Sequence, residues 1–240
     1  MNYPDQTAFV FDVDGTITDS RQPILAEHAD MFNRFINMND VYLLTGSDFA
    51  KTKEQLGDIT YNVMGSYQCA GNELWVNDEL VVTSPEFEPS PRVREWFKQK
   101  LRESPFVLRT GLHEDYRAGM MNFSIVGRGC TLKERLMYAK WDEQHREREQ
   151  MVAEFNQLFS GKFVAQIAGR TGIDIAEEGR DKGQVFFKLD PMYDVIKFFG
   201  DDMQEGGNDW PFANHIRKFP HSCYSVNSPQ ETFEIINESL

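Results

Sequence analysis

The chain has 240 residues, of which 40% are hydrophobic, 26% are charged and 13% are aromatic. This profile excludes a disordered chain, and the length suits either one large domain or two modest ones with buried cores. The formal net charge of −13 argues against nucleic acid and anionic membranes as partners, because both would repel the protein.

The cysteines and the N-terminal residues bear on where the protein works. Cys69, Cys130 and Cys223 have neither the number nor the spacing of a disulfide framework or a zinc site. Residues 1–6 lack the basic and apolar regions of a secretion signal, and no apolar run approaches membrane-spanning length. We therefore expect a soluble, cytoplasmic protein.

The first fifty residues predict a strand–helix–strand unit. Residues 8–12 and 41–45 are short apolar runs followed by turn residues, which is typical of buried parallel strands. Between them, residues 23–37 carry apolar side chains at helical spacing. This pattern predicts the start of an α/β domain.

The middle of the chain has a different pattern. Residues 74–76 and 79–82 predict a hairpin through Asn77 and Asp78. A proline cluster then interrupts the pattern, so we place a domain boundary between residues 82 and 83. Beyond it, we expect helices at 93–102 and 132–159, and strands at 106–109, 120–126, 163–168 and 173–176.

The last fifty residues return to the α/β pattern. Residues 194–199 and 223–226 predict two more strands. Ser228 and Glu231 form a capping-box pattern around Pro229, which predicts a final helix. We therefore expect an α/β core made of residues 1–82 and 186–240, with an inserted α+β cap at residues 83–185.

Asp12 and Asp14 follow the first predicted strand, at the edge of a parallel sheet where ligands bind. Because side chains alternate along an extended chain, both carboxylates are expected to face one site. One carboxylate can attack phosphorus while the other protonates the leaving oxygen. Acidic residues also occur here as helix caps or in turns, but the pair favours phosphoryl transfer through a covalent phosphate on Asp12.

Carboxylates that face an anionic phosphate need a cation, and Mg²⁺ is suited to oxygen ligands from both. Asp201 ends another predicted strand, and Asp209 follows on a glycine-containing loop. Asp209 is expected to bind the metal or to orient the ligands that do. The candidate Mg²⁺ ligands are Asp12, Asp14, Asp201 and Asp209.

Together with Thr45, Ser47 and Lys182, these aspartates resemble the four motifs of the haloacid dehalogenase superfamily. The resemblance implies that Asp12 is the nucleophile and that Asp14 is the general acid and base. It also implies that Thr45 or Ser47 hydrogen-bonds the phosphate and that Lys182 stabilises the developing charge.

Longer segments are similar to the eukaryotic-type phosphomannomutases, in the same order and at similar separations. They are residues 12–22, 46–57, 116–135 and 198–209. The resemblance implies a Rossmann-like haloacid dehalogenase core with an inserted cap. It also implies Mg²⁺ as cofactor, a hexose 1,6-bisphosphate as activator and a homodimer formed through the cap.

The same resemblance assigns a set of substrate contacts. It implies that Arg117, Arg128 and Arg135 hold the substrate phosphate that is not being transferred, and that Arg21 reaches the substrate from the core. Asp174 matches an aspartate of the family's substrate site. Guanidinium groups bind phosphate through paired hydrogen bonds, so a local arginine cluster is what an acidic protein needs for a phosphorylated sugar.

Some positions depart from the family pattern. Gly172 stands where these mutases usually have a serine, and Thr45 stands where they have a glycine. Residues 68–72 lack the family's usual Glu-Asn-Gly. Mutase activity on mannose phosphates, and on glucose phosphates, is the leading hypothesis. The alternatives are a Mg²⁺-dependent sugar-phosphate phosphatase and a catalytically silent sugar-phosphate-binding module.

Overall fold

The computed structural model describes residues 6–217 and 220–238, which form two compact units. The core unit contains the described residues up to Ser84 and from Arg180 onward, and the cap unit contains Pro85–Gly179. Residues 180–185, which the sequence pattern assigns to the cap, therefore belong to the core unit. The reason is that Lys182 forms ion pairs with carboxylates of that unit.

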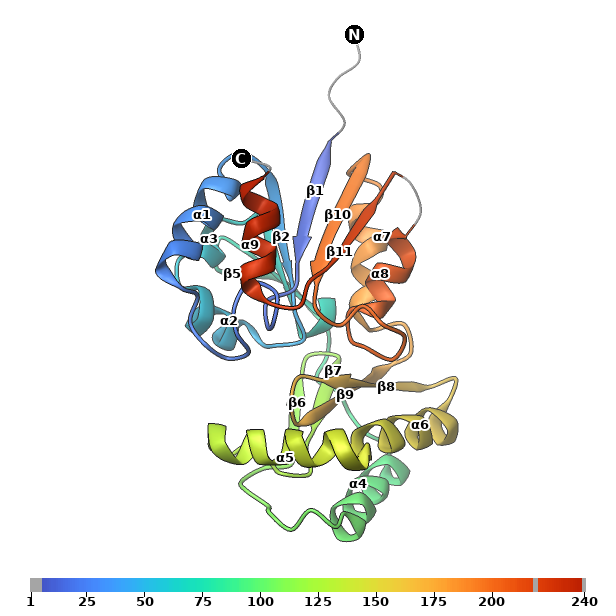
Figure 1. Ribbon diagram of the computed structural model, residues 1–240. Coiled ribbons are helices and arrows are strands. Elements are labelled where there is room, and N and C mark those ends of the chain that lie inside the picture. The colour runs from blue at the N-terminus through green and yellow to red at the C-terminus, as the bar shows by residue number, and fades with distance from the viewer. Residues whose placement is uncertain (1–5, 218–219, 239–240) are drawn as a thin grey trace. The chain divides into compact units, whose positions relative to one another are not determined.

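A seven-stranded sheet forms the centre of the core unit, in the order β11-β10-β1-β2-β3-β4-β5 (Figure 1). The strands from β11 to β3 are parallel, and β4 and β5 add an antiparallel edge. This topology confirms the predicted α/β class. The strands are β1 (Thr7–Phe11), β2 (Asp40–Leu44), β3 (Gly65–Gln68), β4 (Glu73–Val76), β5 (Glu79–Thr83), β10 (Val195–Gly200) and β11 (Ser222–Ser225).

The predicted hairpin between β4 and β5 is confirmed. Its turn residues, Asn77 and Asp78, both have positive φ, at 50° and 61°. Asparagine and aspartate tolerate this left-handed conformation better than most residues, and two such residues in succession match the twist of the flanking strands. The turn thus follows directly from the local sequence.

Helices cover both faces of the core sheet, with α1, α3 and α9 on one face and α7 and α8 on the other (Figure 1). Alternation along β1 explains the two layers, because Val10 packs in the cluster with Phe212 while Phe11 packs in the cluster with Phe32. The helices are α1 (Ala26–Ile36), α2 (Phe49–Leu56), α3 (Ile59–Asn62), α7 (Phe186–Leu189), α8 (Trp210–Ile216) and α9 (Pro229–Asn237), with 3₁₀ turns at Cys69–Gly71 and Lys182–Val185.

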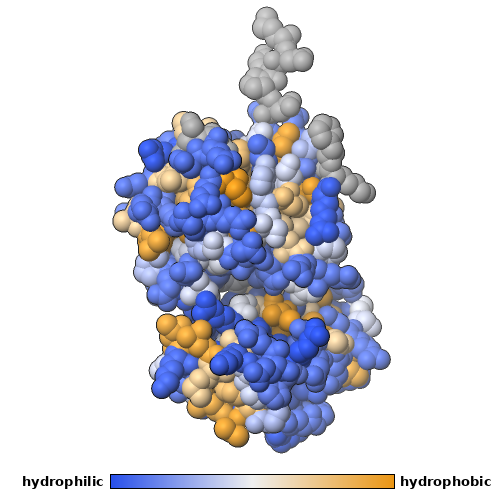
Figure 2. Space-filling view, viewed as in Figure 1, coloured by the Kyte–Doolittle hydropathy of each residue, from blue (hydrophilic) through white to orange (hydrophobic). Residues whose placement is uncertain are grey.

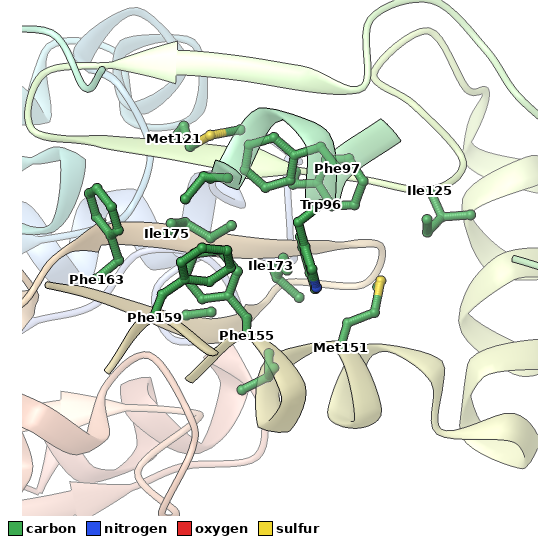
Figure 3. Close-up of a cluster of buried hydrophobic side chains, with 14 of the residues drawn as sticks. Trp96, Phe97, Met121, Ile125, Met151, Phe155, Phe159, Phe163, Ile173 and Ile175 are labelled. Atoms are coloured by element: carbon green, nitrogen blue, oxygen red, sulfur yellow. The ribbon is translucent and has the colours of Figure 1, made fainter. Parts of the chain in front are cut away.

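The cap unit is an antiparallel sheet in the order β6-β7-β9-β8, with helices packed on one face (Figure 1). Met121 belongs to the buried cluster of this unit, which Figure 3 shows together with Phe97 of the helical layer. Phe123 belongs to the same cluster and stacks on Phe97 with a centroid distance of 4.8 Å. The elements are α4 (Pro91–Glu103), β6 (Glu114–Arg117), β7 (Met120–Phe123), α5 (Leu132–His145), α6 (Glu147–Phe159), β8 (Phe163–Ala168) and β9 (Gly172–Glu177).

Two expectations for the cap were wrong. Residues 106–109 form a loop, because the Arg109 guanidinium donates hydrogen bonds to carbonyls that end α4, including that of Leu101 at 3.0 Å. The predicted helix at 132–159 is two helices, separated at Arg146, whose φ of 54° is left-handed. The Arg148 guanidinium lies 2.6 Å from the Asp142 carboxylate, and this ion pair joins the two helices across the break.

Among the described residues, no helix combines the length and apolar character needed to span a membrane.

Candidate active site

The strand order of the core sheet places Asp12 and Asp201 at the same edge. Strands β1 and β10 are parallel neighbours, with Phe11 paired to Phe199. The backbone N–H of Asp12 donates to the carbonyl of Phe199 at 2.9 Å. Residues that follow adjacent parallel strands therefore meet, as expected for a ligand site in an open α/β sheet.

Lys182 holds two of the aspartates together. Its Nζ donates to Asp12 Oδ1 at 2.6 Å and to Asp209 Oδ1 at 2.7 Å. The Lys182 side chain is 1% exposed, so its charge is almost fully removed from water. Burial by itself disfavours that charge, but the two carboxylates outweigh this effect and raise the pKa of Lys182. The ammonium group is therefore a fixed positive charge beside Asp12.

Burial has the opposite consequence for the acidic groups. It raises the pKa of Asp12 well above its ordinary value, and Lys182 opposes this shift only in part. Asp201 keeps part of its surface exposed, but burial removes much of the water around its carboxylate. This loss of water, followed by repulsion from Asp209, raises the pKa of Asp201 to about 7. One lysine thus leaves the carboxylates short of positive charge.

Gly15 is required for the close approach of Asp201. Its φ is 85°, and a Cβ at this position would lie 2.2 Å from Asp201 Oδ2. No side chain larger than hydrogen fits here unless Asp201 moves away. The glycine after the Asp-Val-Asp sequence therefore leaves room for a carboxylate from another strand.

The residues present fit a magnesium ion. Asp12, Asp201 and Asp209 each offer a carboxylate oxygen, and these atoms all lie within 4.8 Å of one another. An all-oxygen donor set suits Mg²⁺, and a divalent cation would supply the positive charge that the raised pKa values of Asp12 and Asp201 call for.

We expect the affinity for Mg²⁺ to fall as the pH falls below about 7. Asp201 has a pKa of about 7, so below this pH a proton occupies the carboxylate and must leave before the metal binds. The Kd for Mg²⁺ should rise roughly fivefold between pH 7 and pH 6 and change little above pH 8. Isothermal titration calorimetry at several pH values measures this dependence.

Asp201→Asn is the control for that measurement. The amide cannot lose a proton at these pH values, so the variant should bind Mg²⁺ weakly and with a smaller dependence on pH. A Kd that stays constant for the unaltered protein between pH 6 and pH 8 would contradict the role given to Asp201.

Asp14 is not part of the carboxylate cluster. Its Oδ1 accepts hydrogen bonds from the backbone N–H of Arg21 at 2.8 Å and from Gln55 Nε2 at 3.0 Å. The alternation that predicts Asp12 and Asp14 on one side does not apply, because β1 ends at Phe11 and the chain bends at the next residue but one. The structure thus does not bring the Asp14 carboxylate into the candidate metal site.

Thr45 and Ser47 follow β2, the other neighbour of β1. The Thr45 hydroxyl accepts the N–H of Ser47 at 3.1 Å, and the Ser47 hydroxyl donates to Asp14 Oδ2 at 3.4 Å. Asp14 is therefore held between the Ser47 hydroxyl and the backbone N–H of Arg21. Gln55, which also donates to Thr18 at 2.9 Å, is a further hydrogen-bond partner of Asp14 and was missed by the sequence analysis.

A second polar group lies on the cap sheet. Asp115, Asn122 and Asp174 are paired across β6, β7 and β9, so their side chains form one row on the face opposite the apolar core. Arg117 donates to Asp115 at 2.7 Å, and the Arg128 guanidinium lies 3.1 Å from the same carboxylate. Predicted site residues from distant parts of the cap are thus brought together.

The cap row contains two residues that the sequence analysis missed, Asp115 and Asn122. Strand alternation could have found Asn122, since it is the polar residue between the apolar Met121 and Phe123. Arg135, the remaining predicted arginine, lies on another element, helix α5. Its predicted role at the substrate phosphate stays a prediction.

Comparison with solved structures agrees with this architecture. A haloacid dehalogenase-like hydrolase from Bacteroides thetaiotaomicron superposes with a TM-score of 0.58 at 12% identity, covering 98% of this chain and 99% of the other. With its parallel sheet and acidic strand ends, the protein has a Rossmann-like haloacid dehalogenase core, as predicted.

The sequence comparisons are more specific. The family model for eukaryotic phosphomannomutase matches residues 93–240. A phosphomannomutase of Encephalitozoon cuniculi is 30% identical, covering 100% of this chain and 96% of the relative. One of Drosophila melanogaster is 29% identical, covering 98% and 96%. The chain belongs to the eukaryotic phosphomannomutase family, which confirms the resemblance found in its sequence.

Proposed function

We propose that this chain is a phosphomannomutase that interconverts mannose 6-phosphate and mannose 1-phosphate, and also acts on glucose phosphates. The buried ion pair between Asp12 and Lys182, beside two further carboxylates, is the observation that carries the proposal. In the proposed reaction, Asp12 carries the phosphoryl group and a hexose 1,6-bisphosphate is both intermediate and activator. Membership of the phosphomannomutase family supports this assignment.

The chemistry follows from the groups around Asp12. Its carboxylate oxygen attacks phosphorus, the bond from phosphorus to the sugar oxygen breaks, and Asp14 gives that oxygen a proton. Lys182 offsets the negative charge that gathers on the transferring group. Bound through Asp12, Asp201 and Asp209, Mg²⁺ would keep the nucleophile ionised and reduce its repulsion of the phosphate.

These steps convert the bisphosphate into a hexose monophosphate, and the same steps run backward form the bisphosphate from a monophosphate that has a free hydroxyl at its other end. Asp14 then removes a proton from a sugar hydroxyl, which attacks the phosphoryl group on Asp12. Throughout, the phosphate that is not being transferred must be held. We assign that role to Arg117, Arg128 and Arg135, with Arg21, Thr45 and Ser47 contacting the substrate from the core unit. Asp174 is assigned to the sugar hydroxyls.

The proposal includes a homodimer formed through the cap unit. Helix α5 exposes three apolar side chains by about half, Leu132, Leu136 and Met137. Figure 2 shows hydrophobic residues gathered on the surface of this unit. Apolar groups that collect on a surface are typical of contact sites.

We also propose a cytoplasmic location, since three cysteines without paired spacing suit a reducing compartment.

The deciding measurement follows two products at once. Mannose 1-phosphate and Mg²⁺ are supplied with and without a trace of glucose 1,6-bisphosphate, and mannose 6-phosphate and inorganic phosphate are both quantified. We expect mannose 6-phosphate to form in the primed reaction with little inorganic phosphate, because Asp12 must be phosphorylated before the first turnover. The unprimed reaction should be markedly slower.

The same assay identifies the alternative. A phosphatase would use the same covalent phosphate but pass it to water, so it would release one inorganic phosphate for each sugar phosphate consumed. Stoichiometric release without dependence on the primer would therefore replace the mutase by a sugar-phosphate phosphatase. The absence of Mg²⁺-dependent turnover in a folded sample would leave only a binding module.

A further inference from the structure

Asn122 lies at the centre of the polar row on the cap sheet. It is 4% exposed, so both ends of its carboxamide need partners. Its Nδ2 donates to Asp174 Oδ1 at 2.7 Å, and its Oδ1 accepts from Arg128 Nη1 at 2.9 Å. A guanidinium can only donate and a carboxylate can only accept, so these partners fix which end of the amide faces each.

Arg128 is held from a second side as well. Asp115 Oδ2 lies 3.1 Å from its Nη2 and also accepts from Arg117 at 2.7 Å. The contacts therefore run without a gap from Arg117 to Asp174, across three strands of one sheet. Asn122 connects Arg128 to the Asp174 carboxylate through one hydrogen bond to each.

The backbone beside Asn122 is adapted to its side chain. A Cβ built on Gly172 would lie 2.6 Å from Asn122 Nδ2 and 2.7 Å from Oδ1, closer than such atoms approach one another. The carboxamide cannot move aside without breaking its hydrogen bond to Arg128 or to Asp174. The position of the Asn122 carboxamide therefore requires a residue without a Cβ at position 172.

We infer that Asn122 is a positioning residue that fixes the spacing between Arg128 and Asp174, and thereby selects hexose phosphates over phosphate esters without a sugar. The inference rests on the proposed function, which makes Arg128 a phosphate contact and Asp174 a hydroxyl contact. A phosphate and a hydroxyl at the two ends of a hexose bind well only when the groups that receive them are held at a fixed separation.

The test compares two asparagines that each make two hydrogen bonds in the cap unit. Asn156 on α6 donates to the carbonyl of Ala165 at 2.9 Å and accepts a hydrogen bond from the N–H of Ala165 at 2.7 Å. These bonds join a helix to the cap sheet and do not involve the polar row. Asn122→Ala should lower kcat/KM for mannose 1-phosphate about 10- to 100-fold. It should leave an aryl phosphate such as p-nitrophenyl phosphate within about twofold. Asn156→Ala should change the ratio of the two values by less than about twofold.

A second set of variants tests the steric pairing with Gly172. Gly172→Ala alone should displace the carboxamide and reproduce the loss seen for Asn122→Ala, again only for the sugar phosphate. When Asn122 is already alanine, the three atoms nearest to the added methyl group are gone. Gly172→Ala should then cost less than about a further twofold, which is a strongly non-additive result.

The outcomes separate this inference from the proposed function. If the unaltered protein interconverts mannose phosphates but Asn122→Ala does so normally, or loses both substrates equally, the positioning role is wrong. If the unaltered protein does not interconvert them, the proposed function fails by itself. The role of Asn122 is then decided by calorimetric binding of mannose 1-phosphate, which Asn122→Ala must weaken and Asn156→Ala must not.

Discussion

Replacing Asp12 by asparagine should abolish turnover of mannose 1-phosphate, with a loss of at least about 10⁴-fold in kcat. An amide is a poor nucleophile toward phosphorus, and it does not bind Mg²⁺ as a carboxylate does. The geometry strengthens this expectation, because Lys182 is directed at Asp12 Oδ1 at 2.6 Å. Steady-state kinetics on purified protein, with labelled phosphate to detect any covalent adduct, measure the effect.

The control must show that the variant still folds, since Lys182 loses one of its two buried anionic partners. Thermal unfolding of Asp12→Asn is compared with that of Asp58→Asn, which alters a side chain fully exposed to solvent in the same unit. A folded Asp12→Asn protein that still forms a covalent phosphate, or retains more than a few per cent of the activity, would remove Asp12 from the reaction.

Replacing Arg128 by alanine should reduce kcat/KM for mannose 1-phosphate by about 10²-fold or more, while an aryl phosphate is affected little. The aryl phosphate and the hexose 1,6-bisphosphate formed from mannose 1-phosphate both present a phosphate to Asp12. Only the bisphosphate has a second phosphate for the cap arginines. Arg117→Ala should behave in the same way, because both guanidinium groups are held by Asp115. Parallel kinetics with the two substrates measure the difference.

Arg102 provides the matched control for these variants. It lies on α4 of the cap unit, where it pairs with Glu95 at 3.1 Å and is largely exposed. Arg102→Ala should leave both substrates unaffected, since exposed ion pairs contribute little to stability. Equal losses for the sugar phosphate and the aryl phosphate in Arg128→Ala would mean that this arginine supports the fold of the cap and does not bind substrate.

The sequence predicts most of the core site because its local patterns decide where strands end. The apolar runs before Asp12 and Asp201 fix two strand ends, and adjacent parallel strands then bring their carboxylates together. Asp14 lies outside the cluster of Asp12, Asp201 and Asp209 because the chain leaves the extended conformation one residue after Asp12. A bend of this kind depends on contacts such as those from Gln55, which lies 41 positions away.

Longer-range pairing accounts for the other differences. Lys182 was assigned to the cap because it follows cap strands in the sequence, yet its partner Asp12 is separated from it by 170 positions. The composition of residues 106–109 predicts a strand, but these residues form a loop because the Arg109 guanidinium donates hydrogen bonds to carbonyls at the end of α4. The importance of Asn122 depends on strand register, which brings Asp174 opposite it from 52 positions away.

The glycines at 15 and 172 also matter for how sequence variation in this protein is interpreted. Each lies where a single added carbon atom would strike a polar group of a candidate site, Asp201 in one case and Asn122 in the other. Neither glycine has a functional group, so a search for chemically reactive residues passes over both. Even the mildest replacement, alanine, would act there as a site mutation, and variants at these positions belong with those that alter catalytic side chains.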